Sequence, residues 1–372
     1  MKLKIKKELL LNALNDVSKA ISTKNIIPIL SGIKFELTDN NLILLASDND
    51  ITIKTILEKS EDLIIEESGS VVIKGRYILD IVRKLESDFI NIEVLEDQKI
   101  LIYTENSNFN LNGISSSEYP DINLSTSEDI VNMKVSDFKS MILQTNYACS
   151  TDEARIVLNG VNITTNNKVL ECSATDSYRL AIRKVAIDEE INNNVNIIIP
   201  SKNLSEFMKI LPVDEDKIIE INIFNNKILF KIDNLFFQSR LITGSYPNTK
   251  NLIPEESLFD LKIKKNDFFN MVDRASILNN DKDNNIITLE LKNKVLKITS
   301  MSLEIGKVEE KLNVDCSEEI KISFSGKYMM DALRTIKSDN VILTFVGEVK
   351  PILLKEENND ELLCLILPIR TY

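Results

Sequence analysis

The sequence has no histidine and no tryptophan among its 372 residues, and the missing histidine excludes the most chemistry. Without imidazole there is no Ser-His-Asp or Cys-His nucleophile, no histidine general base and no His-ligated zinc. Glycine loops for phosphate are missing too. Gly326-Lys327-Tyr328 lacks the upstream glycine and the Ser/Thr of a Walker A sequence, and no GxGxxG occurs. We therefore expect no enzyme of these kinds and no cofactor or metal.

Cysteine is scarce and scattered. The four cysteines are Cys149, Cys172, Cys316 and Cys364, and the two nearest are 23 residues apart, so there is no CxxC pair. This spacing excludes a zinc ribbon and is typical of reduced, buried thiols in a cytosolic protein.

Long apolar runs are also missing. One of the longest, at 362–367, has six residues, whereas a membrane helix needs about 18. The N-terminus, 1–7, is basic but is not followed by the apolar core of a signal peptide. We expect a soluble, cytoplasmic protein with no membrane partner.

Positive charge is in deficit: 45 Lys+Arg stand against 57 Asp+Glu, a net charge of −12. Taken alone, this balance argues against nucleic-acid binding, which usually requires a basic excess.

Three sequence blocks recur in the same order at nearly equal spacing. A short strand running into an amphipathic helix occurs at 4–14, 134–143 and 262–272, with Ile5, Val135 and Ile263 offset by 130 and 128. A second strand–helix block occurs at 71–85, 197–211 and 322–336, offset by 126 and 125. A strand ending in small polar residues occurs at 44–48, 171–176 and 298–300. The sequence therefore predicts three copies of one domain.

Each copy contains the strand–helix block twice, followed by β-rich runs that Asn/Asp pairs punctuate as hairpin turns. Pro and polar residues mark the linkers at 118–123 and 247–256. We predict an α+β fold with domains at 1–127, 128–256 and 257–372.

The acidic charge is unevenly distributed between predicted helices and the rest. The six windows expected to hold helices (6–21, 74–85, 134–147, 200–211, 262–278 and 325–337) carry 18 Lys+Arg and 8 Asp+Glu, a net +10. The remainder is net −22. Lys and Arg are good helix formers that often coat exposed faces, but Glu is equally good, so propensity alone predicts no bias of sign. We interpret the bias as helices facing a polyanion, bound through salt-sensitive phosphate attraction without sequence specificity.

These features resemble one family, the β subunit of bacterial DNA polymerase III, which is the replicative sliding clamp. The resemblance covers the whole chain and is most specific in Ser-Ala-Thr-Asp-Ser-Tyr-Arg-Leu-Ala at 173–181, Val-Leu-Asn-Gly at 157–160, Ser-Tyr-Pro at 245–247 and Leu-Pro-Ile-Arg at 367–370. It implies tandem clamp domains, each with two helices packed on antiparallel sheets. It also implies that two chains pair head to tail into a ring whose helices line a hole for duplex DNA.

The implied function is non-catalytic: the ring encircles DNA and tethers the replicative polymerase, which gives processivity. Other implied partners are the clamp loader and repair proteins, all bound through short peptide motifs. The implied peptide pocket is apolar with a few polar groups. Its residues are Leu158, Thr175, Arg179, Leu180, Pro247, Leu252, Tyr328, Val349, Leu365, Leu367, Pro368, Ile369 and Arg370. Where many members have Gly-His before the arginine, this chain has Ser177-Tyr178.

The resemblance also implies DNA contacts and a ring-closing interface. The DNA contacts are Lys24, Arg76, Arg155 and Lys202. The interface is Phe109 on one edge and Ile277 with Leu278 on the other, since head-to-tail closure needs complementary edges.

Two other classes of protein compete with a clamp. A glycosidase with paired carboxylates is one, but the acidic residues cluster in turns such as 214–216 and 356–357, as solvated loops do. A structural β-repeat scaffold that does not bind DNA is the other, and the charge bias of the helical windows disfavours it.

Overall fold

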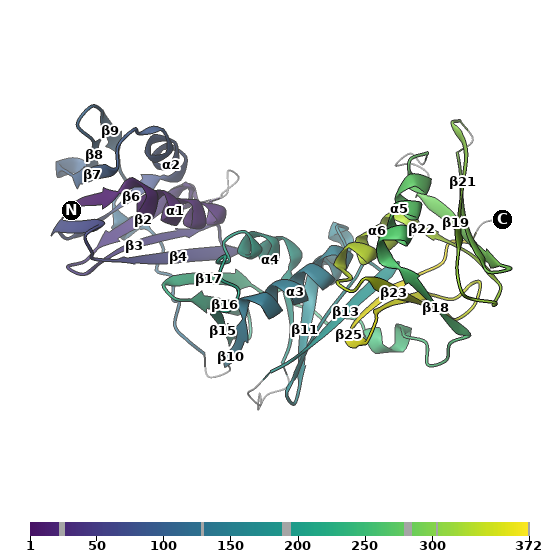
Figure 1. Cartoon of the computed structure of the whole chain (residues 1–372). Helices are drawn as coiled ribbons and strands as arrows, with labels where there is room; N and C mark the ends of the chain where they lie inside the picture. The colour runs from purple at the N-terminus through teal and green to yellow at the C-terminus, as the bar shows by residue number, and fades with distance from the viewer. Residues whose placement is uncertain (22–26, 128–129, 188–194, 279–284, 303, 371–372) are drawn as a thin grey trace. The chain divides into compact units, whose positions relative to one another are not determined.

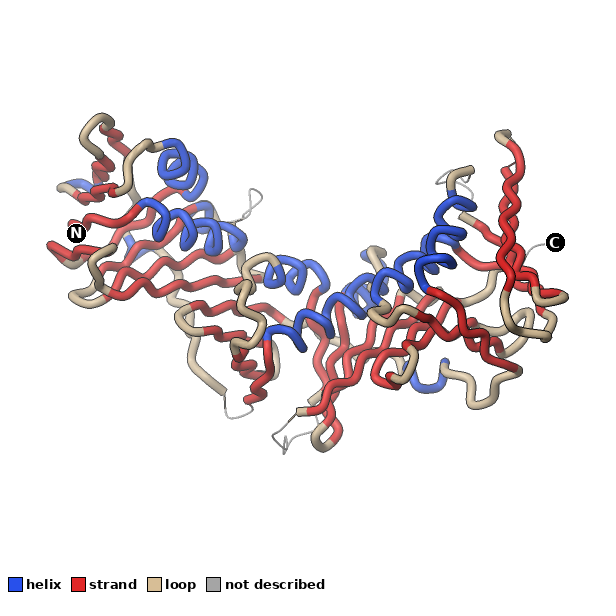
Figure 2. Tube along the Cα trace, viewed as in Figure 1, coloured by secondary structure: helices blue, strands red, loops and turns tan. Residues whose placement is uncertain are grey.

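The computed structural model describes residues 1–21, 27–127, 130–187, 195–278, 285–302 and 304–370. These residues form two compact units. Unit 1 comprises Met1–Val135 and Lys202–Leu241, and unit 2 comprises Ser136–Ser201 and Ile242–Tyr372. Both units are dominated by strands, with helices packed on sheets (Figure 2).

The predicted helices all form, one inside each of the six windows. They are α1 (Lys7–Val17), α2 (Gly75–Lys84), α3 (Val135–Thr145), α4 (Ser201–Met208), α5 (Lys265–Ser276) and α6 (Gly326–Thr335). Beyond their first residues, α3 belongs to unit 2 and α4 to unit 1. Each follows directly on a strand, as both sequence blocks predict.

Unit 1 contains two antiparallel sheets (Figure 1). The first has five strands in the order β5 (Leu63–Glu67), β1 (Lys2–Lys6), β7 (Phe89–Val94), β8 (Lys99–Tyr103) and β9 (Asn108–Asn112). The second has eight, in the order β10 (Ile130–Lys134), β15 (Ile218–Ile223), β16 (Lys227–Ile232), β17 (Leu235–Arg240), β4 (Ile51–Glu58), β3 (Asn41–Ser47), β2 (Gly32–Leu37) and β6 (Gly69–Lys74).

Unit 2 repeats this plan. Its eight-stranded sheet has the order β14 (Asn196–Pro200), β11 (Gly160–Asn166), β12 (Val169–Thr175), β13 (Arg179–Ala186), β25 (Asn359–Ile366), β24 (Ile352–Glu356), β23 (Asn340–Phe345) and β18 (Phe259–Lys264). Its four-stranded sheet has the order β21 (Gly306–Asn313), β20 (Val295–Ser302), β19 (Ile286–Lys292) and β22 (Ile320–Ser325).

The cores lie between the helices and one face of each sheet. Strands such as β3 alternate buried and half-buried residues, because successive side chains of a strand point to opposite faces. In unit 1, Phe207 of α4 stacks on Phe230 of β16 with ring centroids 4.4 Å apart, and it lies 4.8 Å from Phe237 of β17. Aromatic contacts of this kind fix the helix on its sheet.

The structure corrects the register of the first repeated block. Val135 is not a strand residue equivalent to Ile5: it begins α3, as Lys7 begins α1 and Lys265 begins α5. The backbone N–H groups of these three residues donate equivalent bonds, to the carbonyls of Asp88, Lys217 and Asp339. The equivalent strand residue is therefore Met133. The sequence misled because Met133 and Val135 are both apolar at a spacing of two.

Each eight-stranded sheet contains a joint between four-stranded groups from neighbouring copies. In unit 1 the joint is β17 with β4, and in unit 2 it is β13 with β25. Both are antiparallel backbone ladders. By the same strand order, β9 and β21 are the corresponding outer strands, and each has only one partner strand among the described residues.

Three of the four thiols are buried, as the cysteine spacing predicts, and Cys316 is half-buried. Burial raises the pKa of Cys149 to about 12 and that of Cys364 to about 11, so both stay protonated at neutral pH. In the part of the chain that the structure describes, no helix is long and apolar enough to cross a membrane.

Candidate functional site

A cavity of about 850 Å³ opens on the surface of unit 2. The short helix η6 (Glu153–Asn159) forms one wall, and Ser177 with residues 245–248 forms the other. Leu158 and Pro247, both predicted pocket residues, line it together. Leu158 is held in place by a buried cluster with Ile198 and Tyr246. The wall is therefore anchored to the core rather than carried on a free loop.

Arg179, the next predicted pocket residue, is held by two carboxylates and two rings. Its Nε donates to Asp176 Oδ2 at 3.0 Å, and its Nη1 donates to Asp331 Oδ2 at 2.7 Å. The guanidinium lies 4.4 Å from the ring centroid of Tyr328 and 5.3 Å from that of Tyr147. Its side chain is only 10% exposed, so these contacts fix one orientation.

Both phenols beside Arg179 are neutral at physiological pH. Burial raises the pKa of Tyr147 well above its usual value, and burial also raises that of Tyr328. The arginine therefore meets aromatic faces, and its charge is balanced by Asp176 and Asp331.

The turn between β12 and β13 sets the position of Arg179. Thr175 Oγ1 donates to the carbonyl of Arg179 at 2.5 Å, and Asp176 Oδ1 accepts from the backbone N–H groups of Tyr178 and Arg179. Ser177 has φ +78°, in the left-handed region that favours glycine. Serine therefore occupies a strained backbone position here. Its hydroxyl accepts a 2.9 Å bond from Arg155 Nη1, which partly offsets that strain.

Arg155 lies on the wall of this cavity. It was predicted as a DNA contact, and that role stays a prediction. Its hydrogen bond to Ser177 and its place beside Leu158 assign it a structural role in the pocket wall.

Two predicted pocket leucines lie side by side across the joint of unit 2. Leu180 of β13 pairs with Leu365 of β25, and both are almost fully buried. Backbone bonds then hold the C-terminal segment beside the turn: Leu367 N–H donates to the Tyr178 carbonyl at 2.9 Å, and Ile369 N–H donates to the Ser323 carbonyl at 2.7 Å. The joint therefore presents an apolar base next to Arg179.

The remaining predicted pocket residues are more peripheral. Leu252, Val349 and Arg370 are exposed, and Pro368 is half-buried. None of the contacts described above includes them. Tyr178, which is 62% exposed, is a further apolar surface at the same turn.

The equivalent joint of unit 1 is polar. Where unit 2 pairs Leu180 with Leu365, unit 1 pairs Thr52 with Gln238. Where unit 2 pairs Ile182 with Leu363, unit 1 pairs Lys54 with Phe236, and the Lys54 ammonium covers that ring at 4.0 Å from its centroid. Two copies of one joint thus differ in what they can bind, because only the joint of unit 2 pairs apolar side chains beside a fixed arginine.

Exposed cations occupy the same position in three helices. Arg76, Lys202 and Lys327 are the second residues of α2, α4 and α6, and all three are exposed. A cation at a helix N-terminus is unfavourable for the helix dipole, so helix stability does not explain why it recurs. Arg76 and Lys202 were predicted from the sequence. Lys327 was missed, although it aligns with them in the second repeated block. Lys24 lies outside the described residues.

The observed helix bounds change the charge argument. The six helices themselves carry ten Lys+Arg and eight Asp+Glu, so they are net +2 rather than +10. The other lysines of the windows flank the helices: Lys6, Lys134 and Lys264 are the last residues of the strands that precede α1, α3 and α5. The basic excess is concentrated at helix ends, because the predicted windows extended beyond the helices.

The predicted interface residues lie at or near the outer strands. Phe109 is on β9, and its side chain is 37% exposed. Ile277, which follows α5, is 73% exposed, and Leu278 is half-buried. Exposed apolar side chains of this size suit contact with another surface.

Comparison with known proteins covers the whole chain. Family models for the DNA polymerase III beta subunit match in order: the N-terminal domain at 1–124, the central domain at 132–248 and the C-terminal domain at 250–370. The chain is 42% identical to the beta sliding clamp of Staphylococcus epidermidis and 41% identical to that of Staphylococcus aureus, each over the full length of both chains.

Solved structures agree. The DNA polymerase sliding clamp of Bacillus subtilis matches with a TM-score of 0.96 at 38% identity, covering 100% of both chains. The DNA polymerase III beta chain of Streptococcus pneumoniae matches with a TM-score of 0.94 at 31% identity, again with full coverage.

Three tandem domains of helices on antiparallel sheets place the chain in the clamp class of folds. The chain belongs to the DNA polymerase III beta subunit family. Its function is that of a DNA sliding clamp, a processivity subunit with no catalysis of its own.

Proposed function

We propose that two copies of this chain close head to tail into a ring around duplex DNA, without reading its sequence. The observation that carries this proposal is the pair of open edges. In strand order, β9 corresponds to β17 and β25, and β21 corresponds to β4 and β13. Within the chain, β17 pairs with β4 and β25 pairs with β13. Pairing β9 of one copy with β21 of the other would repeat the same joint and give each of these two strands a second partner strand. Phe109 then lies within the closure, and Ile277 with Leu278 meets it from the partner.

The three domains of this ring are 1–127, 128–256 and 257–372. The first boundary adjoins 128–129, which lie outside the described residues. Six such domains make the ring, and the protein works in the cytoplasm, where bacterial DNA is replicated.

The pocket of unit 2 serves as the tether. It combines Arg179 and Thr175 with the apolar surfaces of Leu158, Leu180 and Pro247, which suits an extended peptide with apolar anchors. Leu252, Tyr328, Val349, Leu365, Leu367, Pro368, Ile369 and Arg370 complete the proposed site. Its ligands are short motifs of the replicative polymerase, the clamp loader and repair proteins.

Topological retention on DNA tests the ring. We expect protein loaded onto nicked circular DNA to remain bound through gel filtration, and to be released when one restriction cut makes the DNA linear. Enclosure without tight binding has this consequence, because a sliding ring leaves at a free end. Equal retention on circular and linear DNA would contradict the proposal, and no retention on either would favour a scaffold that does not bind DNA.

Charge reversal tests the DNA contacts. We expect the triple variant Arg76→Glu, Lys202→Glu and Lys327→Glu to load at least about tenfold less well near 0.15 M salt, and its salt dependence to lose a slope of about three, one per phosphate contact. Loading onto nicked plasmid across a salt series measures both.

The control carries the same change of net charge away from the helices: Lys59→Glu, Lys292→Glu and Lys321→Glu, all exposed in the structure. Equal losses in the two triple variants would show that only the total charge matters, and would remove these three residues from the DNA-binding surface.

A further inference from the structure

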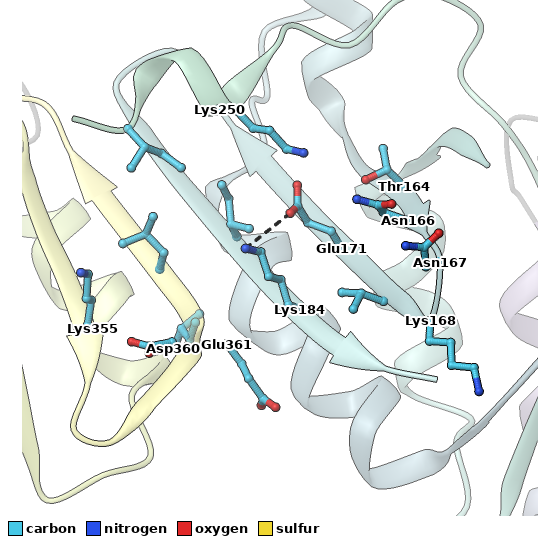
Figure 3. Close-up of a pocket in the computed structure, with 15 residues that line it drawn as sticks. Thr164, Asn166, Asn167, Lys168, Glu171, Lys184, Lys250, Lys355, Asp360 and Glu361 are labelled. Atoms are coloured by element: carbon cyan, nitrogen blue, oxygen red, sulfur yellow. Dashed lines mark ion pairs between the residues drawn. The ribbon is translucent and has the colours of Figure 1, made fainter. Parts of the chain in front are cut away.

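Unit 2 has a second groove that the proposed function does not use (Figure 3). Its volume is about 840 Å³, and it lies on the sheet formed by β11, β12, β13, β25 and β24. Residues 250 and 253, at and just after η7 (Thr249–Leu252), border it on one side, and the hairpin of β24 and β25 borders it on the other. It shares no lining residue with the cavity beside Leu158.

The floor of this groove is apolar and runs into the peptide pocket. Ile182 and Leu363 pair across the joint one step along from Leu180 and Leu365, and all four belong to one packed cluster. Ile253 joins that cluster from the segment after η7, directly after Leu252. The partly buried Leu363 and Ile253 therefore give the groove an apolar floor that packs directly on Leu180 and Leu365 of the proposed pocket.

The rim of the groove carries more free positive charge than free negative charge. Two acids are engaged: Glu171 pairs with Lys184, which Figure 3 marks, and Glu361 pairs with Arg183 at 2.6 Å. Among the described residues, three lining lysines form no ion pair with a carboxylate: Lys168, Lys250 and Lys355. Asp360 is the single lining acid that forms no ion pair there.

The lysines are placed to act on a bound chain. In Figure 3, Lys250 extends over the groove above Glu171, and Lys355 stands on the opposite side. A segment running between them would place apolar side chains on Ile182 and Leu363 and acidic side chains toward the two ammonium groups.

We propose that this groove binds an acidic, extended segment that directly flanks the peptide motif of a partner protein, with apolar residues alternating between its acids. The inference rests on the proposed peptide pocket and adds a specificity element to it. Motif flanks rich in Asp or Glu bind more tightly, and flanks rich in Lys or Arg bind more weakly. On β2, the counterpart of β11, unit 1 has two smaller hollows of about 490 and 260 Å³, and Lys34 and Glu36, which pair at 3.1 Å, line both of them. We therefore assign this specificity to unit 2 alone.

Fluorescence anisotropy with labelled synthetic peptides tests the inference. The core peptide is the clamp-binding motif of the replicative polymerase from the same genome. It is extended at either end by Glu-Val-Glu-Val-Glu or by Lys-Val-Lys-Val-Lys. We expect the acidic extension at one end to raise affinity about fivefold at low salt, from two exposed ion pairs and added apolar contact, and the basic extension to give no gain.

Charge reversal of the groove completes the test. The double variant Lys250→Glu and Lys355→Glu should lose the fivefold gain and bind the core peptide as before. The matched control, Lys292→Glu with Lys321→Glu, has the same net charge and should keep the gain. Acidic and basic extensions that bind equally, or a gain that survives in the groove variant, overturn the inference and leave the pocket standing. A core peptide that fails to bind overturns the proposed pocket and the inference with it.

Discussion

Replacing Phe109 by aspartate is expected to convert the dimer into a monomer that no longer stays on circular DNA. Phe109 stands on β9, the open edge strand, and a third of its side chain is exposed before the ring closes. The proposed ring has two identical closures, so losing a buried aromatic contact at both would cost about 3–6 kcal/mol of dimer stability. Sedimentation measures the change, from twice 42.3 kDa to 42.3 kDa.

Ile64→Asp provides a matched control on the same sheet. Ile64 is 42% exposed on β5, the strand at the opposite edge, which the proposed ring does not use. This variant should remain a dimer and stay on nicked circles. If it dissociates and Phe109→Asp does not, β5 rather than β9 closes the ring.

Placing aspartates at Leu252 and Leu367 is expected to reduce affinity for the polymerase motif by about 100-fold or more. Both leucines are exposed, so the fold tolerates the change, yet each carboxylate would lose water beneath an apolar peptide anchor. Two such contacts correspond to about 3 kcal/mol, which is the stated loss in affinity. Anisotropy with the labelled motif peptide measures it.

Sedimentation of the same pocket variant should still give a dimer, because neither Leu252 nor Leu367 belongs to β9 or β21. Val213→Asp is the control for adding charge at an exposed apolar residue, since Val213 is 95% exposed and lies in unit 1. Unchanged peptide binding by the pocket variant would move the site elsewhere on the chain.

Much of the fold was predictable because the repeats constrain it three times over. Six helices form within the six predicted windows, and Leu180 pairs with Leu365, two residues that the family resemblance assigns to one pocket. Register was harder to predict: apolar residues at 133 and 135 fit the strand pattern equally well, and only the backbone bond of Val135 decides between them.

Features that depend on which strands meet could not be predicted from local sequence. No pattern near Thr52 or Leu180 shows that the two residues occupy equivalent places at two joints, because their partners, Gln238 and Leu365, come from more than 180 residues along the chain. The positive φ of Ser177 was hidden for a different reason. Serine gives no sign of that conformation, whereas glycine would have suggested it.

The sequence correctly predicted that the helices carry a net positive charge, but it overestimated that charge by counting lysines that flank them. Extending each window past the helix ends counted lysines that terminate strands, such as Lys6, Lys134 and Lys264. The structure moves the basic residues from helix faces to helix starts, where Lys327 joins Arg76 and Lys202.

The polar joint of unit 1 has a consequence for how many partners can be served at once. Both joints are held by antiparallel backbone hydrogen bonds, which do not depend on the identity of the side chains. One joint can therefore be apolar and the other polar without weakening the sheet. Each chain then has one proposed peptide pocket, and the proposed ring has two. Partners that bind the same pocket would compete for it, so their relative abundance and affinity would decide which of them is bound to the ring.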